Sequence, residues 1–351
     1  MFLASLRDLQ WRHRRFLVSV GAASLILGVS LIMSGLADSL RSEAEITVEA
    51  VGADHWVVGA GVSGPFSSVS ALPAETASTF DALPGVDAAD PLIVLHQAVT
   101  DAEERQVDVV LFGHEIGGLG SPPVVEGRVV TGPGEAVIDA QAGIGIGETV
   151  TAGAAEFTIV GRTRDLTTLA GLPSLYAPIG EVQGALLGGL DVAQAIVVRG
   201  TPDSLPSELA ALTPVEVVDD MLRPLSAMIG TVQRVRDVLW LAAAAIVGSI
   251  LYLAALERGR DFAVFRAMGF GPARLFASLA IQSIVISALA GVLGIGLAQV
   301  LVPLLPSRLS VPTSALAMLP LVVIAVGIIA SAVTARRAAT TDPALAFGGA
   351  A

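Results

Sequence analysis

Long apolar segments alternate along this chain with one long polar interval. Charge-free apolar runs lie at residues 16–37, 238–256, 275–305 and 314–335. An α-helix rises about 1.5 Å per residue, so about 20 apolar residues are enough to cross a hydrocarbon core of about 30 Å. The pattern therefore predicts four transmembrane helices.

The segment before the first apolar run, residues 1–15, mixes apolar side chains with four arginines. This composition is typical of an amphipathic elbow helix that lies among lipid headgroups. A cleaved signal peptide is the alternative, because residues 35–37 are small enough for a cleavage site, but the run is longer than the usual apolar core of about 7–15 residues.

Within the first apolar run, Gly21, Gly28 and Gly35 recur every seventh residue. We expect them to form one packing stripe, where small residues allow close helix approach in lipid.

The polar interval, residues 38–237, predicts one α/β domain inserted between the first and second membrane helices. Residues 40–51 and 221–237 are expected to be helical stalks that connect this domain to the membrane. Short runs rich in β-branched residues, bounded by Gly, Pro and Asp, predict strands. The predicted strands are His55–Val58, Leu92–Val99, Gln106–Phe112, Ala136–Ile138, Glu148–Val150, Phe157–Val160 and Ala195–Val198, and the predicted helices are Pro73–Leu83 and Glu181–Leu187.

Composition supports a membrane protein and excludes several chemistries. The chain has 351 residues, of which 53% are hydrophobic, and its mean hydropathy of +0.74 is beyond ordinary soluble composition. It has no cysteine, which removes disulfides, thiolate nucleophiles and the common zinc sites. All twenty basic residues are arginines, so the chain lacks the lysine that a Walker-type phosphate loop needs.

Charge is distributed very unevenly. Residues 38–233 hold 27 acidic residues and 7 arginines, a net charge of −20, whereas the rest of the chain holds 5 acidic residues and 13 arginines, a net charge of +8. Short segments rich in arginine stay on the cytoplasmic side of a membrane. The N-terminal tail and the 257–274 loop carry four arginines each and the C-terminal tail two, against one in the 306–313 turn. We therefore expect both termini to be cytoplasmic and the acidic domain to lie outside.

Candidate chemical groups are few. His55, His96 and His114 lack the paired spacing of metal sites, so we interpret them as core or surface histidines. The acidic run Asp101, Glu103 and Glu104 is expected to be a solvated turn, and Asp219–Asp220 to end a strand. Met33 could be a soft ligand for haem iron, but it lies about 120–160° from the glycine stripe, which favours ordinary packing. No nucleophile elbow or Ser/His/Asp set indicates catalysis.

The most informative stretch is ERGRDFAVFRAMG at residues 257–269, between the second and third apolar runs. Its apolar positions follow helical spacing and its charges are of both signs, so we expect a short amphipathic helix. Gly269, Gly271 and Pro272 then turn the chain back. The simplest interpretation is a solvated basic loop that joins two membrane helices.

The stretch resembles the ER-x-R-E-F-A-V-L-R-A-L-G signature that follows the second membrane helix of FtsX-like, or MacB-like, ABC permeases; Asp261, Phe265 and Met268 are mild departures. Residues 126–165 resemble the extracytoplasmic domain of these permeases, and Asp342–Pro343 after Arg336–Arg337 resembles their tail. The resemblance implies a helix that docks on a separate ATPase. The residues implied in this coupling are Glu257, Arg258, Arg260, Asp261, Phe262, Arg266 and Gly269.

The resemblance further implies a multi-pass protein of the cell membrane, with a second permease copy in a homodimer and two ATPase subunits. ATP and magnesium would be bound by the partner, with no cofactor or metal in this chain and no nucleic acid as a partner. Gln282 and Gln299 lie about 100° and roughly 25 Å apart on a helix, so they form no polar track through a single subunit. A hydrophilic channel through one subunit is therefore disfavoured. Members of the resembling family that export hydrophobic compounds, lipoproteins or haem imply an exporter of hydrophobic or amphipathic compounds that works by mechanotransmission to its outer domain.

Two other functions are weighed against this one. A signalling or scaffold permease would regulate an extracytoplasmic partner such as a cell-wall hydrolase, as the cell-division members of the resembling family do. A membrane-anchored enzyme would need a catalytic constellation, which the sequence does not indicate. The transported substrate is not encoded in any motif of the chain.

Overall fold

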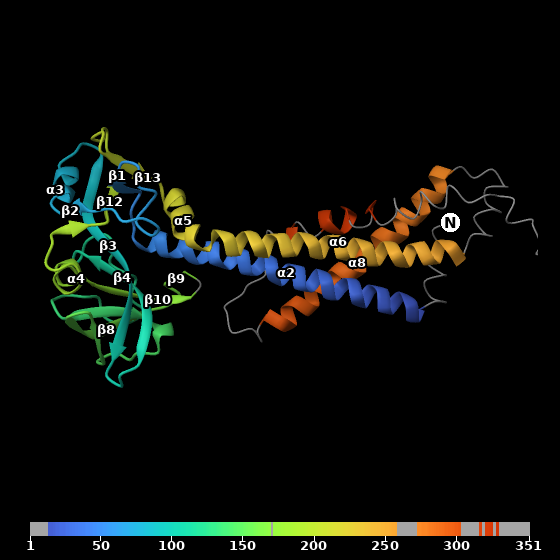
Figure 1. Cartoon of the computed structure of the whole chain (residues 1–351), viewed down its shortest axis with the longest axis horizontal. Helices are drawn as coiled ribbons and strands as arrows, with labels where there is room; N and C mark the ends of the chain where they lie inside the picture. Colours follow the sequence, from blue (N-terminus) through green and yellow to red (C-terminus); the bar gives the residue numbers. More distant parts are fainter. Residues whose placement is uncertain are drawn as a thin grey trace, which may run out of the picture. The chain divides into compact units, whose positions relative to one another are not determined.

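The structure is a computed structural model (Figure 1) that describes residues 13–169, 171–257, 272–302, 316–317, 320–325 and 328–329. The chain divides into two compact units. Residues 1–39 and 228–351 belong to the helical unit, and residues 40–227 form the sheet domain. The predicted 306–313 turn and 336–351 tail lie outside the described residues, as does most of the predicted 1–15 elbow.

One mixed sheet of eleven strands organises the sheet domain, with a two-stranded ribbon, β2–β11, beside it. The strand order is β13-β1-β12-β3-β4-β10-β6-β8-β5; outside this order, β7 pairs with both β3 and β8, and β9 pairs with β10. Neighbours are antiparallel except for the pairs β4–β10 and β6–β8. The strands are β1 His55–Gly59, β2 Leu72–Pro73, β3 Val86–Asp101, β4 Gln106–His114, β5 Glu126–Gly127, β6 Glu135–Asp139, β7 Thr149–Ala152, β8 Ala155–Thr163, β9 Thr167–Thr168, β10 Leu172–Pro178, β11 Val192–Ala193, β12 Ala195–Gly200 and β13 Leu209–Leu212.

The 16-residue strand β3 joins the two halves of the sheet. Its first half pairs with β12 and its second half with β4. Successive side chains of a strand point to opposite faces. Leu92 and Val94 accordingly enter one buried cluster, while Ile93 enters another. One strand thus supplies side chains to hydrophobic cores on both faces.

Short helices complete the sheet domain. The helix α3 (Thr76–Asp81) covers one core through Phe80, and α4 (Ile179–Leu186) covers another through Val182. The helix α5 (Pro214–Leu222) begins with a capping box. Two 3₁₀ turns, η1 (Ala140–Ala142) and η2 (Arg223–Leu225), follow β6 and α5.

The helical unit contains three long described helices. They are α2 (His13–Ala50), α6 (Ser226–Glu257) and α8 (Pro272–Leu301), and the ends of α2 and α6 belong to the sheet domain. Leu27 of α2, Val247 of α6 and Ala290 of α8 meet in one buried cluster, which Val322 also enters. Residues from all four predicted spans therefore pack together.

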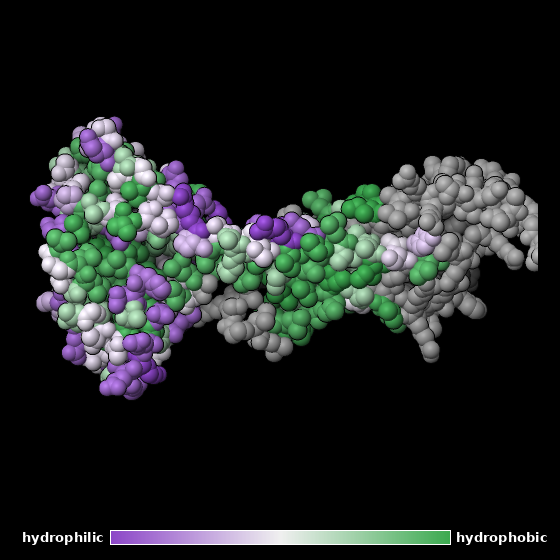
Figure 2. Space-filling view, viewed as in Figure 1, coloured by the Kyte–Doolittle hydropathy of each residue, from purple (hydrophilic) through white to green (hydrophobic). Residues whose placement is uncertain are grey.

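The outer surface of these helices is apolar. Val238, Leu241, Val292 and Val300 each expose more than 60% of their area, and Figure 2 shows a largely hydrophobic surface over the helices. Among the described residues, Val20–Ala50 and Ser283–Leu301 are long and apolar enough to cross a membrane. An apolar surface of this extent is the kind that lipid or another protein covers.

Most predicted elements of the sheet domain are confirmed. All seven predicted strands and both predicted helices have counterparts, and β10 is the main omission. Its two prolines argue against a strand in sequence, yet its residues lie between β4 and β6.

Three expectations about polar segments need correction. Asp219–Asp220 lie inside α5 instead of ending a strand. The predicted helix at 221–237 is interrupted by η2, so α6 begins at Ser226. The turn at Asp101, Glu103 and Glu104 exists, but the Asp101 side chain is only 2% exposed because the turn folds over it.

Candidate functional site at the roots of α2 and α5

The predicted ATPase-coupling residues fall almost entirely outside the described part of the chain. Glu257 is the last residue of α6. The remaining residues of that set, Arg258, Arg260, Asp261, Phe262, Arg266 and Gly269, lie outside the described residues. Their proposed role therefore stays a prediction from the sequence.

The three glycines of the predicted packing stripe differ in environment. A Cβ at Gly28 would lie 3.1 Å from the carbonyl oxygen of Gly294 in α8, whereas Gly21 has open space around it. Gly35 is buried. At Gly28 the α2 and α8 backbones approach so closely that a side chain on either glycine would push them apart.

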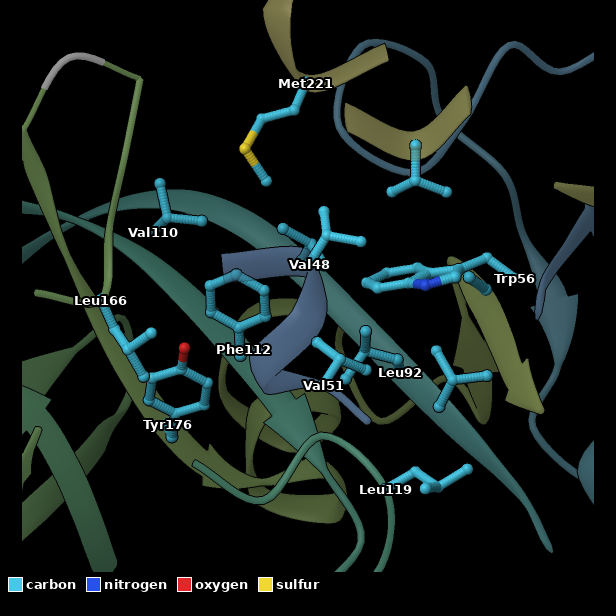
Figure 3. Packing of buried hydrophobic residues seen from close by; sticks show 14 of the residues in the cluster. Val48, Val51, Trp56, Leu92, Val110, Phe112, Leu119, Leu166, Tyr176 and Met221 are labelled. Atoms are coloured by element: carbon cyan, nitrogen blue, oxygen red, sulfur yellow. The ribbon is translucent and has the colours of Figure 1, made fainter. Parts of the chain in front are cut away.

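The C-terminal end of α2 is built into the hydrophobic core of the sheet domain. We call the part of α2 that lies in this domain, residues 40–50, the root of α2, and we call α5 the root of α6. Ala44, Val48 and Val51 are each at most 3% exposed and pack in the cluster that contains Trp56 and Phe112. Figure 3 shows Val48 and Val51 facing these aromatic side chains. Fully burying a valine contributes about 1.5 kcal/mol or more, so this root is held mainly by apolar packing.

Three hydrogen bonds add to the apolar contacts of α2. The buried Thr47 hydroxyl donates to the Thr167 carbonyl oxygen at 2.8 Å. The Glu43 carboxylate accepts from the Gly171 N–H at 2.9 Å, and the Val51 carbonyl accepts from the Gly120 N–H at 2.9 Å. The β9–β10 hairpin thus holds one side of the helix.

A row of aromatic rings crosses the same core. Trp56 and Phe66 have centroids 6.0 Å apart, Phe66 and Phe112 6.3 Å, and Phe112 stacks on Tyr176 at 4.9 Å. Such pairs contribute about 0.5–1.5 kcal/mol beyond their buried area. The row runs from Trp56 in β1, through Phe66 in the β1–β2 loop and Phe112 in β4, to Tyr176 in β10. Burial raises the pKa of the Tyr176 phenol well above its ordinary value.

The helix α5 enters the same core but also carries polar contacts. Val217, Val218 and Met221 are buried in the cluster with Val48 and Trp56. On the neighbouring face, the Asp220 carboxylate is 1% exposed and accepts from the Phe66 N–H at 2.9 Å and the Ser67 N–H at 3.2 Å. The Ser67 hydroxyl donates to the same carboxylate. The β1–β2 loop is therefore fastened to α5.

Two arginines add surface contacts: Arg41 joins α2 to α5, and Arg223 joins η2 to the β1–β2 loop. Arg41 of α2 forms ion pairs of 3.1 Å with Asp219 of α5 and with Glu45. Arg223, in η2 directly after α5, donates to the Ser63 hydroxyl at 2.6 Å. Exposed ion pairs contribute only about 0.2–1 kcal/mol, so the Arg41 contacts add little to the stability of the domain.

The sequence contained an overlooked signal for α5. Thr213 and Glu216 form a capping box, in which the Glu216 carboxylate accepts from the Thr213 N–H at 2.8 Å. The Thr213 N–H has the largest effect on the pKa of Glu216 and the Thr213 hydroxyl the next, and both lower it by hydrogen bonding to the carboxylate. The T-x-x-E pattern with proline at the first helical position marks a helix start. It predicts a helix from Pro214 and therefore places Asp219 and Asp220 on it.

The remaining candidate groups have structural environments. His96 is exposed, His55 is partly buried, and His114 is fully buried at the end of β4 with its ring edge-on to Tyr176. Burial lowers the pKa of His114. Within the described ranges no group of three or more His, Asp or Glu side chains could hold a metal ion. Met33 packs against the cluster that contains Leu31 and Ala298.

Asp101 and Glu135 have shifted pKa values because of nearby arginines and backbone groups. Burial alone would raise the pKa of Asp101, but N–H groups of Arg105 and Glu103 and the Arg105 guanidinium lower it. The Arg128 side chain, helped by the Thr131 N–H, lowers the pKa of Glu135 to about 2. Both carboxylates brace turns and show no arrangement for acid–base chemistry.

Long helices with an apolar surface that continue along the chain into a polar α/β domain are typical of a membrane protein with a folded polar domain. The chain is 38% identical to the uncharacterized ABC transporter permease Rv0072 of Mycobacterium tuberculosis (strain ATCC 25618 / H37Rv), over 99% of this chain and 100% of that protein. It is 36% identical, with the same coverage, to the uncharacterized ABC transporter permease Mb2592 of Mycobacterium bovis (strain ATCC BAA-935 / AF2122/97). Residues 238–343 match the FtsX-like permease C-terminal domain.

The chain therefore belongs to the FtsX-like family of ABC transporter permeases, which are membrane proteins that work with an ATPase. Among solved structures, it is similar to the periplasmic region of MacB from Actinobacillus actinomycetemcomitans, with 16% identity, coverage of 50% of this chain and 96% of that chain, and a TM-score of 0.37. It is also similar to the extracellular domain of the transporter YknZ from Gram-positive bacteria, with 14% identity, coverage of 45% and 98%, and a TM-score of 0.35.

Proposed function

We propose that this chain is a permease subunit that exports hydrophobic or amphipathic compounds by mechanotransmission. In this proposal two copies of the chain pair with two ATPase subunits. ATP-driven closure of the ATPases moves α2 and α6, and these helices move the sheet domain outside the membrane. The supporting observation is that α2 and α5, the latter joined to α6 by η2, are both built into one hydrophobic core.

Packing of this kind suits the transmission of force. Protein interiors are packed as densely as organic crystals and transmit strain. Val48 of α2 and Met221 of α5 lie in the same cluster, and Figure 3 shows both side chains directed into it. A change in the spacing of the two roots would therefore deform the core between them instead of being absorbed by a flexible linker.

The proposed topology has four membrane helices and two cytoplasmic termini. The arginine distribution supports it, because the 257–274 loop and the N-terminal tail carry four arginines each. The loop then faces the ATPase. Its residues Glu257, Arg258, Arg260, Asp261, Phe262, Arg266 and Gly269 would form the docking surface.

Charge reversal in this loop tests the proposal. Exchanging the charges in the double variant Glu257→Arg, Arg258→Glu should weaken ATPase binding by about 2–5 kcal/mol if both charges are desolvated at the interface. The measurement is the amount of ATPase that co-purifies with the chain, together with the ATPase rate of the complex in lipid nanodiscs. The matched control is Arg308→Glu, a reversal in the turn predicted to lie on the opposite side.

Each outcome of this test has a defined meaning. Reduced co-purification for the loop variant and normal co-purification for the control would support the docking assignment. Unchanged co-purification of the loop variant would refute it. An unmodified complex that hydrolyses ATP but moves no hydrophobic compound into or out of vesicles would instead favour the signalling role, in which the sheet domain regulates an extracytoplasmic partner.

A further inference from the structure

The β1–β2 loop, residues 60–71, is held by an unusual buried carboxylate. Asp220 projects from the last turn of α5, and its partners are the Phe66 N–H, the Ser67 N–H and the Ser67 hydroxyl. All three donors are neutral groups of the loop. Burying a carboxylate destabilises the fold unless hydrogen bonds satisfy its oxygens. The three donors of the loop meet this need, so Asp220 binds this loop specifically.

The loop is shaped to receive this carboxylate. Gly64 approaches Asp220 so closely that a Cβ at this position would collide with the carboxylate. On either side of Gly64, Ser63 accepts a hydrogen bond from Arg223 and Phe66 packs beside Trp56. Two consecutive elements, α5 and η2, thus hold the loop at separate points, and the chain continues directly from η2 into α6.

Val69 lies between two held points of the loop, because the next residue, Ser70, is 4% exposed and its hydroxyl accepts from the Gly59 N–H of β1 at 3.2 Å. Val69 is 85% exposed. It follows Phe66 and Ser67, which Asp220 holds, by only two or three positions, so a displacement of these residues relative to β1 should change the surroundings of the Val69 side chain.

We propose that Asp220 is a positioning residue that makes the 60–71 loop follow α5, so that movement of α6 is delivered to this loop on the outer surface of the sheet domain. This inference rests on the proposed function, in which α6 is moved by the ATPase. It goes further because it names one loop as the moving output and one carboxylate as its attachment.

A single introduced cysteine can report the movement, because the native chain has none. The full chain carrying Val69→Cys is labelled with an environment-sensitive fluorophore, assembled with its ATPase in lipid nanodiscs, and measured with and without ATP and vanadate. The reference is Leu190→Cys, which lies between α4 and β11 and is 64% exposed. We expect a nucleotide-dependent signal at position 69.

The positioning role is then tested by substitution. Asp220→Ala should abolish the nucleotide-dependent signal at position 69 while leaving any signal at position 190 unchanged. Asp220→Asn retains an acceptor oxygen and should keep part of the signal. If Asp220→Ala does not fold, Gly64→Ala tests the same contact from the loop side, since its Cβ would displace the loop from an intact α5.

The possible results separate this inference from the proposed function. A full signal at position 69 in folded Asp220→Ala or Gly64→Ala would overturn the positioning role. No signal in the unmodified complex, with the ATPase bound and active, would overturn the loop as the moving output and leave the proposed function standing. Failure of the unmodified chain to bind any ATPase would refute the proposed function and this inference together.

Discussion

The two roots that connect the sheet domain to its long helices are built differently. The helix α2 runs without a break from His13 to Ala50, and its buried face in the domain is mainly apolar. The route through α5 to α6 is interrupted by η2 and adds the buried carboxylate of Asp220 to its apolar contacts. The root of α2 therefore rests mainly on non-directional apolar contacts, whereas α5, the root of α6, adds directional hydrogen bonds to the 60–71 loop.

The largest effect should come from disturbing the apolar root of α2. Val48 is 1% exposed, and Val48→Asp would bury a carboxylate without a partner at a cost of at least about 3 kcal/mol. The control Ile46→Asp changes a residue that is 43% exposed and should be nearly neutral. Thermal unfolding of the purified full-length chain measures both. Equal melting temperatures for the two variants would contradict the assignment of Val48 to the buried apolar root of α2.

A smaller effect is expected at the beginning of α5. Thr213→Ala removes the N-cap hydroxyl, which should destabilise the helix by about 1 kcal/mol. Hydrogen exchange should then become faster in α5 and remain unchanged in the 40–50 part of α2. Thr213→Ser retains the hydroxyl and serves as the control. If exchange in both helices became faster together, the two roots would behave as one cooperative unit and the contrast between them would be lost.

The smallest expected effect is a dependence of folding stability on pH that comes from Glu216 in α5. The folded state lowers the pKa of Glu216 below its ordinary value of 4.5. Its stabilising contribution is therefore complete above about pH 4.5 and is lost as the pH falls through the lowered folded value.

The matched substitution Glu216→Gln makes this pH effect measurable. It should lower the melting temperature at pH 7, and the difference from the unmodified chain should shrink as the pH falls below 4.5. The contacts of Val48 and Val51 carry no titratable group. The difference that Glu216→Gln makes should therefore not extend to hydrogen exchange of the amides of these two residues. A difference that stays constant with pH would exclude the capping carboxylate as its source.

The sequence by itself determined the class of this protein and much of its local structure. The charge-free runs predicted membrane helices, the signature at 257–269 indicated the permease family, and runs rich in β-branched residues located seven strands. These signals are local, because a helix or strand shows its buried face as a period in the sequence. The T-x-x-E signal at Thr213 was equally local and would have placed Asp220 on a helix.

Only the tertiary structure showed how distant segments meet. The pairing of β10 with β4 and β6 overrode the two prolines that argue against a strand. Asp220 binds amides more than 150 positions earlier in the chain, and Thr47 binds a carbonyl 120 positions later. No sequence period records such contacts, since they arise when the sheet brings separate elements to one core. The contacts that hold α2 and α5 in the sheet domain therefore depend on the tertiary structure and cannot be predicted from a local sequence pattern.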